Sequence, residues 1–343
     1  VAHTSFLGFS HPPAVRLAQQ LVGLFPGGEL SRVFYSDDGS TAIEAAVRMA
    51  LQYWRNQGTP QRDTLLAFDR AYHGDTLGAA SLGGLPVFKG AANDFGYQVK
   101  RVPSLEALSQ HDPSKLAAVI IEPLIQGAAG IRTWPPGMLK QLSDWCRTHD
   151  VFLILDEVMT GFGRTGKMFA CQNEDVVPDF IALAKGISGG YLPLAATLTT
   201  ERVFNGFQAP EHTFYYGHSY TANPLGCAAA LASLEVFREE RVLEQLPEKI
   251  ELFRQALDEL RDEPHVTDIR QCGMIAGIDI GPFDPADRTG ARVCMAARAH
   301  GLLTRPVLDT LVLMPPLCVT QVEMEHMVRA LSLGMRDVLG GQN

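Results

Sequence analysis

Residues 179–198 read DFIALAKGISGGYLPLAATL, and one charged side chain stands inside this apolar run. After Asp179, the only formally charged residue before Glu201 is Lys185. Burial of an unpaired ammonium among apolar side chains costs several kcal/mol. The sequence therefore predicts that the Lys185 side chain either reaches solvent or carries its amine in a form other than an ordinary ammonium.

A second apolar run ends in an acidic residue. In VFLILDE (151–157) the apolar part ends at Asp156, and FIALA (180–184) ends just before Lys185. In an open parallel α/β sheet, ligands bind at the carboxyl ends of the strands, so both side chains are expected in one crevice. The alternative is a buried salt bridge or a lysine that extends to solvent, and for a lysine alone that alternative is favoured. The small residues GISGG (186–190) favour a ligand site, because they leave room for a flat cofactor.

Aliphatic runs alternate with helical patterns through much of the chain. Further candidate strands are TLLAF (64–68) and AAVIIEP (117–123). Candidate helices are TAIEAAVRMALQYW (41–54) and PPGMLKQLSDWCRTH (135–149), and the second opens on prolines suited to a first helical turn. The strand candidates are apolar on both faces, as expected where helices cover both sides of a sheet. The predicted fold class is α/β with a mostly parallel sheet.

The character of the sequence changes near residue 238. A charge-rich helical stretch, REERVLEQLPEKIELFRQALDELRDE (238–263), is followed by VTDIRQCGMIAGIDI (266–280), which indicates a pair of strands around Gly273. We therefore predict a large domain over residues 1–238 and a smaller α+β domain over residues 239–343.

Composition limits the partners of the protein. Of the 343 residues, 46% are hydrophobic and 20% are charged, and no apolar stretch reaches the roughly 20 residues that a bilayer span requires. The net charge of -9 argues against a protein that binds nucleic acid, since such proteins usually carry a basic stripe. We expect neither a membrane segment nor a nucleic-acid partner.

The cysteines and the start of the chain indicate a reducing compartment. The six cysteines are widely spaced, without a C-x-x-C pair or a histidine at ligand spacing, so no metal site is expected. The opening VAHTSFLGFSHPPAV lacks the basic and apolar regions of a secretory signal. Both features favour a cytoplasmic location.

A lysine beside a carboxylate suggests a specific cofactor. A desolvated lysine loses its proton easily and forms Schiff bases with aldehydes such as pyridoxal phosphate. A carboxylate such as that of Asp156 would then pair with the protonated pyridine nitrogen and keep the ring an electron sink. A Schiff base with the cofactor would explain how the amine of Lys185 can stand in an apolar run without being an ordinary ammonium.

The hypothesis also requires a phosphate site, and YSDDGSTAIEAAVRMA (35–50) offers one. Gly39 allows close backbone approach, Ser40 and Thr41 carry hydroxyl groups, and the following helix presents free N–H groups. The alternative is an ordinary helix cap, which this motif alone would indicate, with Glu44 completing it.

A flat ring further needs a stacking partner. AYHGDT (71–76) supplies Tyr72 for that purpose, although an aromatic residue in a loop is more often packed in a core. For His73, a contact with the ring and a polar residue without a chemical role are both open interpretations.

Several motifs together resemble a known family. DEVMTGFGRTG (156–166), ALAKGISGGYLPLAA (182–196), DGS (38–40) and YHGDT (72–76) resemble the class III aminotransferases of pyridoxal-phosphate fold type I, from near residue 8 to past residue 330. Within that class, YHGD, IEPLIQGAAGI (121–131), GHSYTANPLGCAAA (217–230) and RPVLDTLVLMPP (305–316) are most similar to the 7,8-diaminopelargonate synthases.

The resemblance implies an activity. It implies transfer of an amino group to 8-amino-7-oxononanoate in biotin biosynthesis, with pyridoxal 5′-phosphate as cofactor and S-adenosylmethionine as the usual donor, lysine being another. Two alternatives remain open: another class III transaminase that acts on a diamine or an ω-amino acid, and a catalytically silent dimerisation module. The second is motivated by an expected difference, because Val1 falls inside the family pattern and an N-terminal segment with pocket aromatics is expected to be missing.

The resemblance also assigns residues. Lys185, Asp156 and Tyr72 would be catalytic, Lys185 holding the cofactor, Asp156 its pyridine nitrogen and Tyr72 its ring face. Gly39, Ser40, His218 and Ser219 would bind the cofactor phosphate region, the last two in the partner subunit of a homodimer. Tyr72, Gly217 and Arg305 would bind substrate, with Arg305 on the distal carboxylate of the keto acid.

Asp38 departs from the family pattern, which more often has serine or asparagine at that position. A carboxylate close to a phosphate should repel it. We therefore expect Asp38 to turn away and cap backbone N–H groups.

Overall fold

The computed structural model describes residues 3–86 and 96–340, and its main sheet has seven strands in the order β1-β9-β8-β7-β4-β2-β3. In that order the strands are β1 (Leu30–Ser36), β9 (Ala195–Thr200), β8 (Phe180–Leu183), β7 (Phe152–Asp156), β4 (Leu116–Ile121), β2 (Thr64–Phe68) and β3 (Val99–Val102). Strand β9 is antiparallel to both of its neighbours, and the other neighbouring pairs are parallel. The predicted mostly parallel α/β sheet is confirmed.

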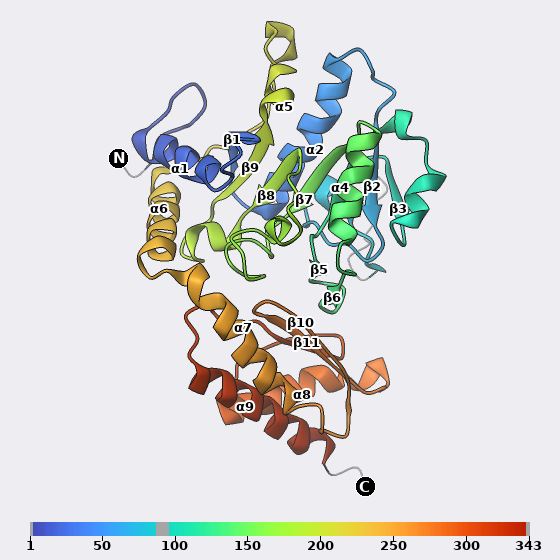
Figure 1. Ribbon diagram of the computed structural model, residues 1–343, viewed down its shortest axis with the longest axis vertical. Coiled ribbons are helices and arrows are strands. Elements are labelled where there is room, and N and C mark those ends of the chain that lie inside the picture. Colours follow the sequence, from blue (N-terminus) through green and yellow to red (C-terminus); the bar gives the residue numbers. More distant parts are fainter. Residues whose placement is uncertain (1–2, 87–95, 341–343) are drawn as a thin grey trace.

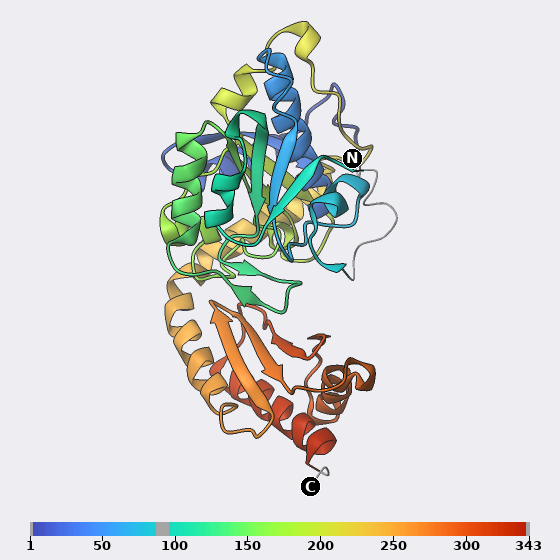
Figure 2. The same ribbon diagram turned by 90° about the vertical axis from the view of Figure 1, so that its right-hand side faces the viewer.

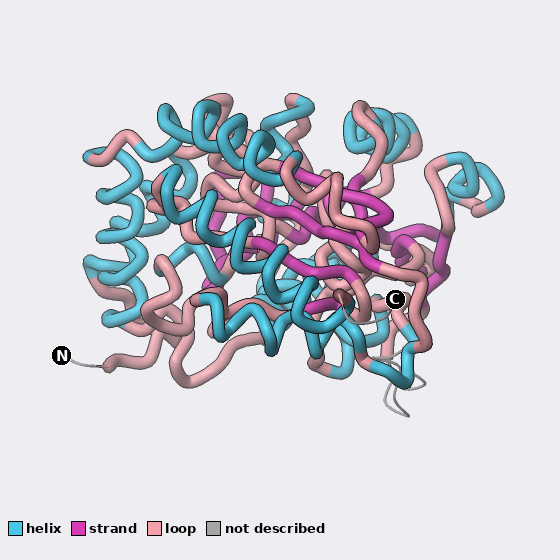
Figure 3. Tube along the Cα trace, turned by 90° about the horizontal axis from the view of Figure 1, so that it is seen from below, coloured by secondary structure: helices cyan, strands magenta, loops and turns pink. Residues whose placement is uncertain are grey.

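Helices cover both faces of this sheet, as its apolar strands predicted. One face packs against α2 (Gly39–Asn56), and the other packs against α1 (Pro12–Gly23), α4 (Met138–Thr148) and α6 (Pro224–Glu239). Successive strand residues alternate between the two cores: Phe152 and Ile154 face α2, whereas Leu153 and Leu155 face the opposite side. Seen from below, the helices (cyan) lie outside the strands (magenta) (Figure 3).

The C-terminal part has a sheet and a core of its own. Its strands are β10 (Val266–Cys272), β11 (Ile275–Ile280), β13 (Thr310–Leu313) and β12 (Pro306–Val307), all paired antiparallel in that order. The helices α7 (Val242–Asp258), α8 (Thr289–Ala297) and α9 (Gln321–Leu339) share one apolar core with this sheet. Figures 1 and 2 show this part below the main sheet, with α7 running alongside from one part to the other.

The predicted strand pair is confirmed by β10 and β11, which meet at Gly273 with a φ of 58°. A Cβ at this glycine would lie 2.4 Å from the carbonyl oxygen of Arg164, so the turn packs tightly against the main-sheet part. The division of the chain into domains 1–238 and 239–343 stays a prediction; it falls at the junction of α6 and α7.

Two helix starts differ from the sequence prediction. Helix α4 begins at Met138 rather than Pro135, because Gly137 at its N-cap is left-handed (φ 79°) and the prolines precede the helix. Helix α2 begins at Gly39, two residues earlier than predicted, because Asp38 caps it. Smaller elements are α3 (Leu77–Leu82), α5 (Glu201–Asn205) and the hairpin of β5 (Ile125–Gln126) and β6 (Arg132–Thr133).

Two arginines join the main-sheet part to the C-terminal part. Arg270 on β10 donates from Nη2 to the carbonyl of Gly130 (2.8 Å) and from Nε to that of Ile131 (3.1 Å). Arg164 donates from Nη1 to the carbonyls of Met274 (3.2 Å) and Pro315 (2.5 Å). These bonds fix the C-terminal part beside the carboxyl ends of the main strands. Within residues 3–86 and 96–340, no helix combines the length and apolar character needed to cross a bilayer.

Candidate active site

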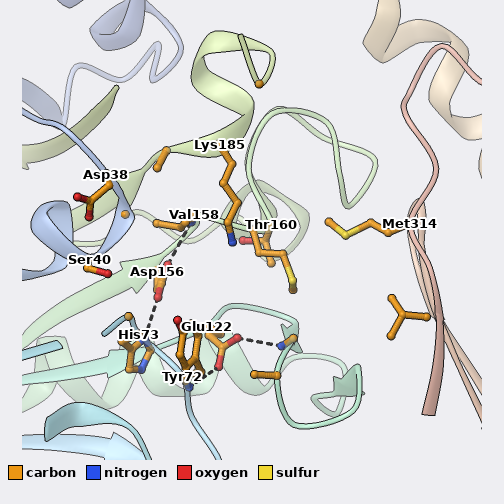
Figure 4. Close-up of a pocket in the computed structure, with 18 of the residues that line it drawn as sticks. Asp38, Ser40, Tyr72, His73, Glu122, Asp156, Val158, Thr160, Lys185 and Met314 are labelled. Carbon is orange, nitrogen blue, oxygen red and sulfur yellow. Dashed lines mark hydrogen bonds and ion pairs between the residues drawn. The ribbon is translucent and has the colours of Figure 1, made fainter. Parts of the chain in front are cut away.

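A cavity of about 970 Å³ lies at the carboxyl ends of the central strands. Asp156 is the last residue of β7, and Lys185 follows β8. Both side chains line this cavity, as the strand order predicted, and Figure 4 shows them pointing into it. Of the other predicted residues, the cavity is lined by Gly39, Ser40, Tyr72 and Arg305.

Lys185 opens the short 3-10 helix η6 (Lys185–Ser188). Its neighbours Leu183, Ala184 and Ile187 are buried, whereas Lys185 itself is exposed. Of the two outcomes predicted for Lys185, a side chain that reaches solvent is the one observed, because its apolar neighbours pack into the core while the lysine turns toward the cavity. Its φ of 46° lies in the left-handed region, a strain of about 1–3 kcal/mol that is typical of functional sites.

Asp156 is held from two sides. Its Oδ1 accepts the backbone N–H of Val158 (3.1 Å), and its Oδ2 lies 2.8 Å from Nδ1 of His73. The side chains of His73 and Asp156 are 0% and 8% exposed. Sequence reasoning left the role of His73 open, and the structure places it as the partner of Asp156.

Tyr72 lies in the loop between β2 and α3. Its hydroxyl donates to Oδ2 of Asp75 (2.7 Å), and its backbone N–H donates to Oε1 of Glu122 (3.1 Å). Burial, together with the hydrogen bond to Asp75, raises the pKa of Tyr72 to about 12, so the phenol stays protonated at neutral pH.

Glu122 is a site residue that sequence reasoning missed. It follows β4 directly, is only 7% exposed and lines the cavity. The signal was present in AAVIIEP (117–123), where an acidic residue ends an apolar strand just as Asp156 does in VFLILDE (151–157).

The N-terminus of α2 lines the cavity through Gly39 and Ser40, and a helix N-terminus suits an anion. Asp38 Oδ1 accepts the N–H of Thr41 (3.0 Å), and Thr41 Oγ1 in turn accepts the N–H of Asp38 (3.1 Å), so Asp38 caps the helix as expected. Among hydrogen bonds of the described residues, the backbone N–H groups of Gly39 and Ser40 have no protein acceptor. The Ser40 hydroxyl oxygen accepts the N–H of Asp75 (3.2 Å), which joins this terminus to the Tyr72 loop.

Arg305 lines the same cavity from the C-terminal part, just before β12. The cavity wall carries several apolar side chains from both parts of the chain, as Figure 4 shows for Met314. These are Leu85, Ile131, Val158, Met159, Leu192, Leu194, Val307, Leu308, Val312 and Met314. The site therefore combines a charged reaction end with an apolar wall and a guanidinium.

Gly217, His218 and Ser219 do not line this cavity in the described part of a single chain. His218 instead borders a smaller cavity of about 420 Å³ beside Thr41, and its Nδ1 lies 3.1 Å from Oδ2 of Asp37. Their assignment to the cofactor of a partner subunit stays a prediction.

Comparison with known families identifies the family of the chain that carries this cavity. The family described as aminotransferase class-III matches residues 1–334. The chain belongs to the class III aminotransferases. As predicted from its sequence, it is an aminotransferase of the pyridoxal 5′-phosphate-dependent fold.

Individual relatives of this aminotransferase agree with the family. It is 46% identical to the adenosylmethionine-8-amino-7-oxononanoate aminotransferase of Nitratidesulfovibrio vulgaris, over 96% of this chain and 67% of that protein. The crystal structure of the enzyme of that name from Methanocaldococcus jannaschii matches with a TM-score of 0.95 at 37% identity, covering 99% of this chain and 82% of that one. An amine transaminase from an uncultivated Pseudomonas species, in its PLP-bound form, matches with a TM-score of 0.90 at 32% identity, covering 98% and 84%.

The residues present fit pyridoxal phosphate. The free N–H groups at the start of α2 suit its phosphate, the Asp156 carboxylate suits a ring N–H, and the Lys185 amine suits an aldehyde carbon. A Cβ at Gly39 would lie 2.7 Å from Cγ1 of Val158, so only glycine leaves this cradle unobstructed. The predicted roles of these residues stay proposals.

Proposed function

We propose that this aminotransferase transfers an amino group to 8-amino-7-oxononanoate to give 7,8-diaminononanoate, with S-adenosylmethionine as the donor. The observation that carries the proposal is that Arg305 lines the same cavity as Lys185, with apolar side chains in the wall. The acceptor has matching chemistry: a keto group near one end, an aliphatic chain and a carboxylate at the other end. The names of the relatives support the same substrates.

The reaction end is served by Lys185 and Asp156. When bound, pyridoxal phosphate supplies an aldehyde that takes up the amino group and a ring that accepts an electron pair. Lys185 Nζ would hold the cofactor, and its amine would move a proton at the substrate carbon as general base and acid. Asp156 would accept a hydrogen bond from the ring N–H and so keep that proton in place, while Tyr72 would cover the ring face.

Arg305 serves the distant end of the acceptor. A planar guanidinium can bind a carboxylate through two parallel hydrogen bonds. Fixing that end decides which carbon of the chain lies beside Lys185, and orientation of this kind contributes to the rate. The apolar wall, including Val312 and Met314, covers the aliphatic chain and excludes analogues with polar groups there.

A homodimer belongs to this proposal. The stretch from Gly217 to Ser219 lies outside the cavity of its own chain, which supports a role at the site of a partner subunit. Exposed apolar side chains close to it in sequence, Tyr215 at 87% and Tyr220 at 63%, support a covered surface in the assembly. We also propose a cytoplasmic location, in keeping with biotin biosynthesis.

Purified protein loaded with pyridoxal phosphate tests the activity. With S-adenosylmethionine present, we expect 7,8-diaminononanoate to form from 8-amino-7-oxononanoate, and we expect no comparable turnover when pyruvate replaces that acceptor. Turnover of pyruvate alone would favour a diamine or ω-amino acid transaminase. Two of the structural neighbours are named omega transaminases. Exchange of S-adenosylmethionine for lysine in the same assay identifies the donor.

The same preparation tests the cofactor link and the assembly. Lys185→Ala should lose the visible absorbance band of the bound cofactor, whereas the parent chain should keep it through gel filtration. A parent chain that emerges without that band would favour a catalytically silent module. Light scattering in the same run gives the molar mass, and a monomer would contradict the proposed shared site.

A further inference from the structure

Glu122 is a buried carboxylate to which the proposed reaction gives no role. Its two oxygens accept two backbone N–H groups: Oε1 accepts that of Tyr72 (3.1 Å) and Oε2 accepts that of Gly127 (2.9 Å). Figure 4 shows the Glu122 carboxylate next to Tyr72, with dashed lines for its hydrogen bonds. One side chain therefore ties together two segments that are about fifty residues apart in sequence.

Both tied segments form walls of the cavity. One carries Tyr72 and His73, and the other runs from Gly127 to Ile131. Gly127 already packs closely, since a Cβ there would lie 2.5 Å from Sδ of Met159. A shift of either segment therefore changes the width of the cavity where the cofactor ring is expected.

The double tie depends on the charge of Glu122. An ionised carboxylate accepts hydrogen bonds at both oxygens, whereas a protonated carboxyl group carries a hydrogen on one of them. The protonated oxygen loses its negative charge and one acceptor position, so it accepts the N–H of Tyr72 or of Gly127 less strongly. Protonation therefore weakens one of the two ties.

The surroundings bring this ionisation close to neutral pH. Burial raises the pKa of Glu122 to about 7; Asp156 raises the pKa further, while His73 and the two backbone N–H groups lower it. Two further titratable side chains, Tyr72 and Lys185, line the same cavity, and the Tyr72 hydroxyl is bonded to Asp75. A buried carboxyl group with such a pKa changes its charge within the working range of most enzymes.

We propose that Glu122 is a positioning residue whose ionised carboxylate holds the Tyr72 loop and the Gly127 segment together, so that uptake of a proton loosens one wall of the cavity. The inference rests on the proposed function for the role of Tyr72 as cover of the ring. Glu122 touches no reacting atom and acts through the two backbone groups that it binds.

Amide hydrogen exchange in the cofactor-free chain tests the ties directly. After correction for the intrinsic rate, protection of the Tyr72 or the Gly127 amide should fall roughly tenfold between about pH 8.5 and about pH 6, which corresponds to one weakened hydrogen bond. Unchanged protection of both amides over this range would overturn the proposal. This measurement needs no variant and no substrate, so failure of the proposed activity leaves it intact.

Glu157 offers a matched control, because its buried carboxylate also accepts two backbone N–H groups, those of Ala170 (2.7 Å) and Cys171 (2.8 Å), but does not line the cavity. At about pH 8.5, Glu122→Gln should lose protection at Tyr72 or Gly127, and Glu157→Gln should lose it at Ala170 or Cys171. A Glu122→Gln protein with parental protection at Tyr72 and Gly127 would contradict the proposal.

Cofactor affinity separates positioning from a general loss of stability. We expect Glu122→Gln to weaken the binding of pyridoxal phosphate roughly tenfold at about pH 8.5 and much less at about pH 6, where the parent is itself protonated. Glu157 does not line the cavity, so Glu157→Gln should weaken cofactor binding much less than Glu122→Gln does at about pH 8.5. A Glu122→Gln deficit that does not change with pH would show a structural role only and would overturn the inference.

Discussion

The imidazole Nδ1 of His73 lies 2.8 Å from Oδ2 of Asp156, and the two side chains are almost entirely buried. Because an ionised carboxylate only accepts hydrogen bonds, Nδ1 carries the proton in this pair. The backbone N–H of Val158 holds the other oxygen, so the carboxylate has one fixed orientation. Asp156 would thus meet the proposed ring nitrogen without having to reorganise, which is the property that an electrostatic partner needs.

Replacement of His73 should weaken catalysis through Asp156. His73→Phe leaves a buried carboxylate oxygen without its donor, at a cost of about 1–3 kcal/mol, and we expect kcat to fall roughly tenfold or more. His73→Asn keeps an N–H donor near the position of Nδ1 and should lose less. Steady-state kinetics of both variants check this, and equal losses would contradict a role for the hydrogen bond.

Arg305 should discriminate acceptors by their carboxylate. Arg305→Met removes the charge-assisted bonds, and we expect kcat/KM for 8-amino-7-oxononanoate to fall by about 10- to 100-fold. Arg305→Lys keeps the charge but not the two-point geometry, so its kcat/KM should lie between that of the parent and that of Arg305→Met. The methyl ester of the acceptor is the control: the parent should prefer the acid, and Arg305→Met should not. If Arg305→Met loses kcat/KM equally for the acid and for the ester, the distal carboxylate does not bind at Arg305.

The sheet and the meeting of Lys185 with Asp156 were predictable because both rest on local pattern and topology. Apolar runs such as 152–156 and 180–183 identify buried parallel strands, and parallel strands bring their carboxyl ends to one edge. Nothing beyond the order of the elements was needed for this step. The structure agrees in both respects.

The contacts around the site were not predictable in the same way. The pairs His73 with Asp156 and Glu122 with Tyr72 join strands and loops that are 83 and 50 residues apart, so no spacing in the sequence indicates them. The sequence left open whether Lys185 reaches solvent, since a run of apolar neighbours says nothing about the direction of one side chain after a strand ends. Such directions depend on the backbone angles, here the positive φ of Lys185.

Stability should fall as the pH rises toward neutrality. Burial raises the pKa of Glu122 to about 7 and that of Asp179 to about 6, above their ordinary values of 4.5 and 3.8. At these two groups the folded chain therefore binds more protons than the unfolded chain between about pH 4 and pH 7, and their contribution to the unfolding free energy decreases over that range by a few kcal/mol, to order of magnitude. Urea unfolding at several pH values measures it.

The contribution of Glu122 to the change of unfolding free energy with pH can be measured separately. Glu122→Gln carries no titrating group at that position and should show a smaller decrease in unfolding free energy over the same range. Asp179→Asn should reduce the slope at its lower-pH end, because the pKa of Asp179 is lower than that of Glu122. If both variants keep the parental slope, the burial of these carboxyl groups is not what shapes the pH dependence.

Asp38 should limit cofactor affinity while it stabilises α2. Its side chain accepts the N–H of Thr41 and so caps the helix, yet its negative charge stands next to Gly39 and Ser40, where a phosphate is expected. Asp38→Asn keeps an oxygen for the cap and removes the charge, and we expect unchanged stability with cofactor binding tighter by about fivefold, the effect of roughly 1 kcal/mol of screened repulsion. Asp38→Ala removes both and should lose about 1 kcal/mol of unfolding free energy. Cofactor titration and thermal unfolding of the two variants separate the effects, and weaker binding by Asp38→Asn would mean that the carboxylate assists the phosphate site instead of opposing it.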